Sequence, residues 1–323
     1  MTTGNLGMDE GGIRGSSSPT APPAWLADVD RVARGIRRRV LEHTLRNNGG
    51  YLSQACSSAD ALATLYVRLM KLGPSIAPPV PPPFLGVPGP GNPTYMTGSG
   101  YNGPHEPALD RFFFSPVHYA LVLYSTLIEV GRMAPEGLAQ FNQDGSSVEL
   151  IGAEHSPGHE VTAGSLAQCL SQAAGVALAR KLKGEPGHNW VFMSDGEFQE
   201  GQTFEAIAAM AWQKIDNVTV LVDANEQQCD GAMRKVMEID PIAQRVKAFG
   251  GAAADVDGHD PEALVAAASS RQAGKPLVIV CHTDPCRGIP LLATRGGKLH
   301  YVRFKSSHEE ERFRAFLHEM EGG

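Results

Sequence analysis

The sequence predicts an α/β protein in which a parallel sheet is covered by helices on both faces. Three apolar runs, residues 190–193, 218–223 and 276–281, have the length and composition of buried strands. Segments with apolar residues at helical spacing lie before, between and after these runs. Strands that alternate with helices form a parallel sheet, because each connection crosses a face of the sheet before the next strand begins.

The chain is expected to contain one domain, residues 25–323, preceded by a tail. Residues 1–24 are rich in Gly, Ser, Thr and Pro and are predicted to be disordered. Helices are expected over residues 25–46 and 57–71, where apolar side chains recur every three or four positions. The turn-forming residues 47–51 (NNGGY) separate these two helices.

A loop rich in Pro and Gly is expected over residues 73–107. Loops of this length are usually either functional or disordered. Phe84, Tyr95, Met96 and Tyr101 are poorly suited to solvent, which favours an ordered loop at the edge of the site or of an interface.

The elements after this loop follow the same alternation. Helices are predicted over residues 116–131, 165–183, 201–214 and 309–320, around the three strands. No internal repeat is visible.

Polar residues follow two of the predicted strands directly. Asp195 comes after the strand over 190–193, and Asn225 comes after the strand over 218–223. Because a βαβ unit brings the carboxyl ends of both strands to one edge of the sheet, these side chains are expected to converge. A carboxylate and an amide oxygen suit Mg²⁺ or Ca²⁺, and Gly196 lets backbone N–H groups approach a phosphate. A helix-capping Asp and a turn Asn are the simpler alternative.

Several segments resemble the signatures of transketolases. Residues 194–201 (SDGEFQEG) and 222–231 (VDANEQQCDG) are similar to the thiamine-diphosphate signature, which runs from Gly-Asp-Gly to Asn and includes Gln-Glu-Gly and a terminal Asp-Gly. Residues 164–168 (GSLAQ) resemble the family's Gly-Ser-Leu-Gly-Gln, and residues 110–118 (DRFFFSPVH) resemble Asp-Arg-Phe-Val-Leu-Ser-Lys-Gly-His. Matches in one order along most of the chain are more specific than any single motif.

This resemblance implies a thiamine-diphosphate-binding fold of the pyrophosphate-domain type. It implies that Asp195, the Asn225 side chain and the Gln227 carbonyl hold Mg²⁺ or Ca²⁺. It also implies that Gly196 and Glu197 offer backbone N–H groups to the diphosphate. Gly164 and Leu166 match the segment that lines the thiazolium ring.

Two histidines and one glutamate are the catalytic candidates that the resemblance implies. His118 and His300 match family histidines that surround the reacting carbonyl, and His300 also reaches the cofactor phosphate. Glu200 matches a glutamate that couples two active sites across an interface. An exposed glutamate at the start of a helix is an equally good interpretation of Glu200.

The chain also departs from the family pattern. The histidine of the family's Gly-His-Pro-Gly-Gly segment is missing from residues 48–51, and only a shifted loop would let His155 or His159 replace a second missing histidine. Ser194, Ala167 and Cys169 stand where the family has glycine. These changes suggest an unusual substrate.

A separate pyrimidine-binding subunit is the expected partner. Transketolases activate the cofactor with a glutamate from a second α/β domain, which needs on the order of 150 residues, and few residues follow His300. The resemblance therefore implies a heterotetramer that transfers a two-carbon ketol or acyl unit from a ketose or 2-oxo donor to an aldehyde-type acceptor. Two alternatives remain: the α subunit of a 2-oxo acid dehydrogenase or decarboxylase, and a degenerate regulatory subunit.

Composition argues against other classes of function. A formal charge of -7 without a basic cluster opposes nucleic-acid binding. No segment reaches membrane-spanning length or has the pattern of a secretory signal, so a cytoplasmic protein is expected. The five cysteines form no paired framework, and Cys281 and Cys286 lack a second pair of zinc ligands, so reduced thiols are expected.

Overall fold

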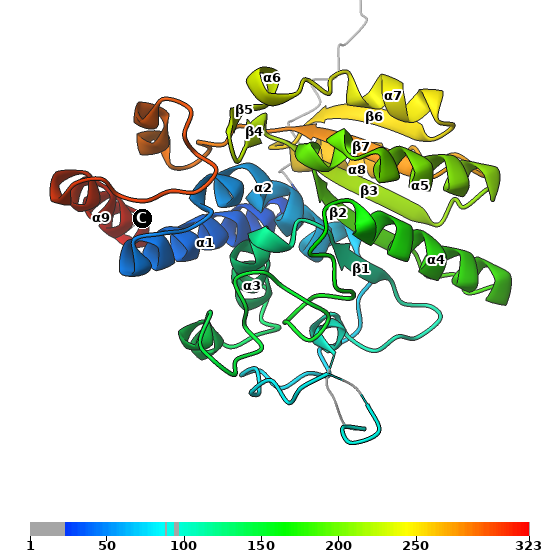
Figure 1. Ribbon diagram of the computed structural model, residues 1–323, viewed down its shortest axis with the longest axis horizontal. Coiled ribbons are helices and arrows are strands. Elements are labelled where there is room, and N and C mark those ends of the chain that lie inside the picture. The colour runs from blue at the N-terminus through cyan, green and yellow to red at the C-terminus, as the bar shows by residue number, and fades with distance from the viewer. Residues whose placement is uncertain (1–22, 88, 94–96, 323) are drawn as a thin grey trace, which may run out of the picture.

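The computed structural model describes residues 23–87, 89–93 and 97–322. Its centre is a five-stranded sheet in the order β1-β2-β3-β7-β6, and every neighbouring pair is parallel (Figure 1). The strands are β1 (Arg111–Phe114), β2 (Asn189–Ser194), β3 (Val218–Ala224), β6 (Ala252–Asp257) and β7 (Leu277–His282). The predicted fold class is therefore confirmed.

Helices cover both faces of this sheet. Alternate strand residues point to opposite faces, and each face builds its own hydrophobic core. Phe112, Phe192 and Ile279 belong to the core that packs under α1 (Ala24–Asn47), α2 (Leu52–Thr64), α3 (Ala120–Glu129) and α8 (Pro261–Ala268). Val191, Val220 and Val280 belong to the core under α4 (Gln168–Lys183), α5 (Gly201–Trp212) and α7 (Ile242–Ala248).

The remaining regular elements lie at the periphery. Helix α9 (Ser307–Gly322) packs against α1 (Figure 1). The two-stranded hairpin β4 (Gln227–Gln228) and β5 (Gly231–Ala232) follows β3 and leads into the short α6 (Met233–Val236). No helix in the described part of the chain is long and apolar enough to cross a membrane.

The predicted strands over 190–193, 218–223 and 276–281 correspond to β2, β3 and β7, and sequence reasoning missed β1 and β6. Strand β1 has only four residues, so its period is too short to recognise. Strand β6 (AAADVD) consists mainly of Ala and Asp, which are rare in strands. It lies at the edge of the sheet and pairs only with β7, so it needs less apolar surface than a central strand.

The predicted helix over 57–71 begins earlier than expected. Helix α2 starts at Leu52, and its last turn continues as a π-helix, Leu65–Leu69. The early part contains the polar residues Ser53, Gln54 and Ser57, which interrupt the apolar pattern by which a helix is recognised. In the structure all three side chains are buried and hydrogen-bonded. Burial of paired polar side chains cannot be read from hydrophobic periodicity.

The long loop over 73–107 contains no strand or α-helix among its described residues. The buried Tyr101 hydroxyl donates to the Pro78 carbonyl at 2.8 Å, and Arg132 donates to the carbonyls of Tyr101 and Gly73 at 3.0 Å each. The two Arg132 bonds attach the loop to the segment after α3, and the Tyr101 bond joins two parts of the loop. Tyr95, Met96 and residues 1–22 of the predicted tail lie outside the described residues.

Candidate active site

A cleft of about 330 Å³ lies at the carboxyl ends of β2 and β3. In a parallel sheet this edge is where ligands usually bind. Most of the residues expected to bind cofactor or metal line it. Its lining consists of Tyr51, Val117, His118, Tyr119, Ile151, Gly164, Leu166, Ser194, Asp195, Gly196, Gln199, Glu200, Gln227, Gln228, Cys229 and His300.

Asp195 starts the 3₁₀ turn Asp195–Gln199 after β2 and is 2% exposed. Its Oδ1 accepts the Gly196 N–H and its Oδ2 accepts the Glu226 N–H, both at 2.8 Å. Burial, followed by the nearby Asp223 carboxylate, raises the pKa of Asp195 well above its usual value. A cation beside Asp195 would stabilise its ionised form.

Asn225 lies one residue beyond β3 and is 2% exposed. Its Nδ2 donates to Asp223 Oδ2 at 2.8 Å and to the Tyr119 hydroxyl at 3.2 Å. Its Oδ1 accepts the Gln227 N–H at 2.9 Å. Because Asp195 binds the backbone of Glu226, the next residue, the two strand ends converge as the βαβ argument expects.

The side-chain oxygens gathered at this point suit a hard cation. Asp195 supplies a carboxylate and Asn225 an amide oxygen. The side-chain Oε1 of half-buried Gln227, a different atom from the carbonyl expected from the sequence, lacks a hydrogen-bond partner among the described residues. Mg²⁺ and Ca²⁺ prefer such oxygen ligands. The described residues contain no group of three or more His, Cys, Asp or Glu placed to hold a metal.

Glu197 organises the site through its carboxylate. The side chain is fully buried, and its Oε1 accepts the Ala167 N–H at 3.0 Å and the Ser115 hydroxyl. Its Oε2 accepts the Ser194 N–H at 2.8 Å, while its own backbone N–H donates to the Ser194 hydroxyl in a capping box. Glu197 therefore joins three chain segments. Its backbone N–H was expected to face a diphosphate, but in this structure it donates to the Ser194 hydroxyl.

Ala167 is held in a left-handed conformation with φ 70°. This region favours glycine, the residue that the family pattern has at this position. Glycine avoids the crowding of Cβ, which costs roughly 1–2 kcal/mol, although it loses more entropy on folding.

Replacing Ala167 with Gly is therefore expected to stabilise the protein by about 0.5–1 kcal/mol. Chemical denaturation with urea measures the change. Ala179→Gly, at an exposed position of α4, is the matched control and is expected to cost about 1 kcal/mol. Equal destabilisation by both substitutions would contradict the strain at Ala167.

His118 and His300 lie together in the lining of the cleft. Their ring centroids are 5.4 Å apart, and the Tyr51 ring meets both edge-on at 5.3 and 5.5 Å. Burial, with a smaller contribution from His300, lowers the pKa of His118 to about 3. Burial also lowers the pKa of His300. Both rings are therefore neutral hydrogen-bonding groups near pH 7.

Gln54 sets the tautomer of His300. Its Nε2 lies 3.2 Å from His300 Nδ1 and donates to the His300 carbonyl at 2.9 Å. Because an amide nitrogen can only donate, Nδ1 accepts and the ring proton is assigned to Nε2. Sequence reasoning missed Gln54 and Tyr51, since no motif marked residues at the start of α2 as neighbours of His300.

The family model described as "Transketolase, thiamine diphosphate binding domain" matches residues 98–303. The chain belongs to this transketolase family. A putative uncharacterized transketolase family protein of Sinorhizobium fredii is 32% identical over 286 residues, which cover 87% of this chain and 92% of that protein. Resemblance to the transketolase branch is thus confirmed.

Two other relatives of this transketolase-family chain are named as subunits. The 6-deoxy-6-sulfo-D-fructose transketolase subunit of a Clostridium species is 28% identical, with 91% of this chain and 96% of that protein covered. An apulose-4-phosphate transketolase subunit from Phocaeicola vulgatus is 26% identical, with 85% of this chain and 89% of that protein covered. The expected likeness to the N-terminal, pyrophosphate-binding subunit of a divided transketolase is confirmed.

Solved transketolases share the fold. The structure from Campylobacter jejuni superposes with a TM-score of 0.68 at 20% sequence identity, covering 91% of this chain and 47% of that one. The chain thus spans about half the length of that transketolase. At this identity the likeness supports the fold alone.

Neither candidate replacement for a missing family histidine reaches the cleft of this transketolase-family chain. The His155 ring packs at a tilt of 31° against Phe84 with centroids 4.2 Å apart, and its Nε2 lies 3.0 Å from a Glu149 carboxylate oxygen. His159 is fully buried, with Nδ1 3.2 Å from the Pro157 carbonyl. Ile151 lines the cleft instead.

The other predicted residues lie at the rim. Glu200 is exposed and precedes the first turn of α5 without forming a side-chain cap. Gly164 has open space where a Cβ would be, and Leu166 is 37% exposed. Among the five cysteines, Cys229 is exposed at the rim, whereas Cys56, Cys169 and Cys281 are buried.

Proposed function

We propose that this chain is the pyrophosphate-binding subunit of a two-component transketolase-like enzyme. It would transfer a two-carbon ketol or acyl unit from a ketose or 2-oxo donor to an aldehyde-type acceptor. The observation that carries the proposal is one cleft whose lining includes Asp195 and Gln227 together with two neighbouring neutral histidines. The relatives that are named as subunits support the division between two chains.

Cofactor and metal would be held by the carboxyl ends of β2 and β3. Asp195, the Asn225 amide oxygen and the Gln227 main-chain carbonyl would hold Mg²⁺, with Ca²⁺ as a chemically similar alternative. The Gly196 N–H, which donates to Asp195 Oδ1 in this structure, would turn to the diphosphate on binding, while Gly164 and Leu166 would border the thiazolium ring. Thiamine diphosphate supplies a carbon nucleophile and an electron sink for C–C cleavage.

The histidines would bind and orient the substrate. With Nδ1 accepting from Gln54, His300 offers an Nε2–H donor that can hydrogen-bond a substrate hydroxyl or carbonyl oxygen. His118 lies beside it with a neutral ring. Positioned neutral imidazoles can hold or move a proton at such an oxygen. Glu200 at the rim would lie against another subunit.

The cleft wall suggests what this chain recognises in the substrate. Tyr51, Val117 and Ile151 make the wall near His118 apolar, and none of the described lining residues is Lys or Arg. An anionic group on the substrate would therefore have to be bound by the partner subunit. The partner would also supply the glutamate that activates the cofactor, in a cytoplasmic heterotetramer.

Reconstitution of the two chains tests this proposal. The purified chain alone is expected to bind thiamine diphosphate only when Mg²⁺ is present, and to show no ketol transfer. Adding a pyrimidine-binding transketolase chain from the same genome is expected to start turnover. Turnover is measured as product formation from hydroxypyruvate and a panel of aldehydes.

The possible failures are distinct. Ketol transfer by the single chain would contradict the two-component arrangement, and absence of any cofactor binding would contradict the proposed function. Metal-dependent binding without turnover in the reconstituted complex would favour the regulatory alternative.

A further inference from the structure

A buried carboxylate behind Asn225 has no role in the function proposed above. Asp223, the penultimate residue of β3, is 1% exposed. Its Oδ2 accepts Asn225 Nδ2 at 2.8 Å and the Ser57 hydroxyl at 2.7 Å. Its Oδ1 accepts the Thr283 hydroxyl at 2.6 Å. Three donors from different parts of the chain thus converge on one side chain.

These bonds determine which way the Asn225 amide faces. A carboxylate accepts hydrogen bonds, so the NH₂ end of the amide points towards Asp223. Its oxygen then points the other way, where it accepts the Gln227 N–H. Rotating the amide by 180° would place oxygen against oxygen at Asp223 and would remove the acceptor for Gln227.

We infer that Asp223, together with Ser57 and Thr283, is a positioning group that orients the Asn225 oxygen towards the cation of the cofactor. The inference rests on the proposed function, in which Asn225 holds that cation. A flipped amide would present an N–H donor to the metal, which cannot ligate it. Groups that orient metal ligands in this way typically change metal affinity by about 10–100-fold when they are removed.

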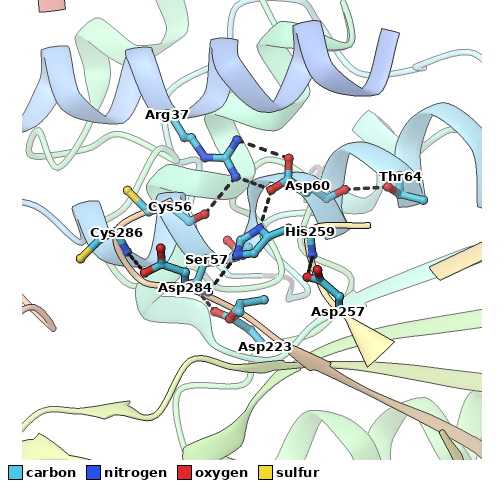
Figure 2. Close-up of polar contacts among 12 residues, drawn as sticks. Arg37, Cys56, Ser57, Asp60, Thr64, Asp223, Asp257, His259, Asp284 and Cys286 are labelled. Atoms are coloured by element: carbon cyan, nitrogen blue, oxygen red, sulfur yellow. Dashed lines mark hydrogen bonds and ion pairs between the residues drawn. The ribbon is translucent and has the colours of Figure 1, made fainter. Parts of the chain in front are cut away.

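The donors to Asp223 are themselves held by a second polar cluster. Asp60, one turn after Ser57 on α2, bonds to Arg37 and to His259 Nδ1, the latter at 2.7 Å (Figure 2). His259 Nε2 accepts the Asp284 N–H at 2.8 Å, next to Thr283. His259 thus links the helix that carries Ser57 with the segment that carries Thr283.

This bridge spans four separate elements. Arg37 comes from α1, Asp60 from α2, and His259 and Asp284 from the segments after β6 and β7. Figure 2 shows the Ser57 hydroxyl bonded to Asp223 alongside this cluster. The geometry around Asp223 therefore depends on packing between elements and not on flexible surface contacts.

The substitution Asp223→Asn tests the inference with little change of shape. It places an amide that can donate or accept beside Asn225, so the Asn225 side chain can flip. The Mg²⁺ dissociation constant at saturating thiamine diphosphate, measured by calorimetry, is expected to rise about 10–100-fold. The unfolding midpoint is measured in parallel. Asp255→Asn, at an exposed position of β6, is the matched control and is expected to leave the constant unchanged.

A double variant separates positioning from a general structural role. In Asp223→Asn/Asn225→Asp, the carboxylate at 225 presents oxygen in both orientations, and the new amide at 223 can donate to it. Mg²⁺ binding is expected to recover at least about tenfold relative to Asp223→Asn. A side chain that only supports folding would not be rescued in this way.

Each result has a distinct meaning. If the wild-type chain binds no Mg²⁺ and cofactor, the proposed function fails and not the role of Asp223 alone. If wild type and Asp223→Asn bind Mg²⁺ equally, the inference is overturned while the proposed function stands. If Asp223→Asn does not fold, Thr283→Val decides: weaker Mg²⁺ binding by a folded protein supports the inference, and unchanged binding overturns it.

Discussion

Alanine in place of Asp195 is expected to weaken Mg²⁺-dependent binding of thiamine diphosphate by on the order of 100-fold or more. Removal of a group that only orients a ligand costs about 10–100-fold, and Asp195 is proposed as a ligand itself. It would also be the one carboxylate of the set, and without it only neutral amide and carbonyl oxygens remain. Titration calorimetry with and without Mg²⁺ measures the loss.

Two further proteins make the Asp195 result specific. Asp255→Ala removes an exposed carboxylate from the same sheet and is expected to bind like the wild type. Asp195→Asn keeps one oxygen, so intermediate affinity is expected. If the cofactor affinity of Asp195→Ala lay within about twofold of the wild-type value, Asp195 would be excluded as a metal ligand. For scale, a tenfold change in affinity corresponds to about 1.4 kcal/mol.

Truncation of Glu197 to alanine is expected to destabilise the protein by about 3–5 kcal/mol. The carboxylate is fully buried and accepts hydrogen bonds from Ser115, Ala167 and Ser194. Its removal leaves these donors without partners in a site closed to water, and each unsatisfied group costs about 1–3 kcal/mol. Denaturation by urea, followed by circular dichroism, gives the change in unfolding free energy.

Glu205→Ala is the matched control for Glu197, because Glu205 is exposed on the neighbouring helix α5. Its substitution is expected to change stability by less than about 0.5 kcal/mol. Glu197→Gln retains one acceptor oxygen and is expected to fall between the two. If Glu197→Ala lost no more stability than the Glu205 variant, the buried carboxylate could not be what joins the three segments.

Strands β2 and β3, and the convergence of the residues that follow them, were predictable because they depend on local pattern. Two apolar runs joined by one helix must return in parallel, so the residues after each run meet at one edge of the sheet. Asp195 and Asn225 follow from this rule, and their convergence is what the structure shows. Strand β6 was not predictable, since its Ala and Asp residues carry no strand signal.

The sequence by itself determined the α/β class, the central strands and the identity of the polar residues at their ends, because periodicity and chain connectivity act over short distances. Only the tertiary structure decided how those residues are used. The Asn225 orientation depends on Asp223 and on donors from α2 and from the segment after β7. The His300 tautomer depends on Gln54, 246 positions away in the chain. Such roles are set by hydrogen-bond partners that packing brings together, and no local pattern encodes those partners.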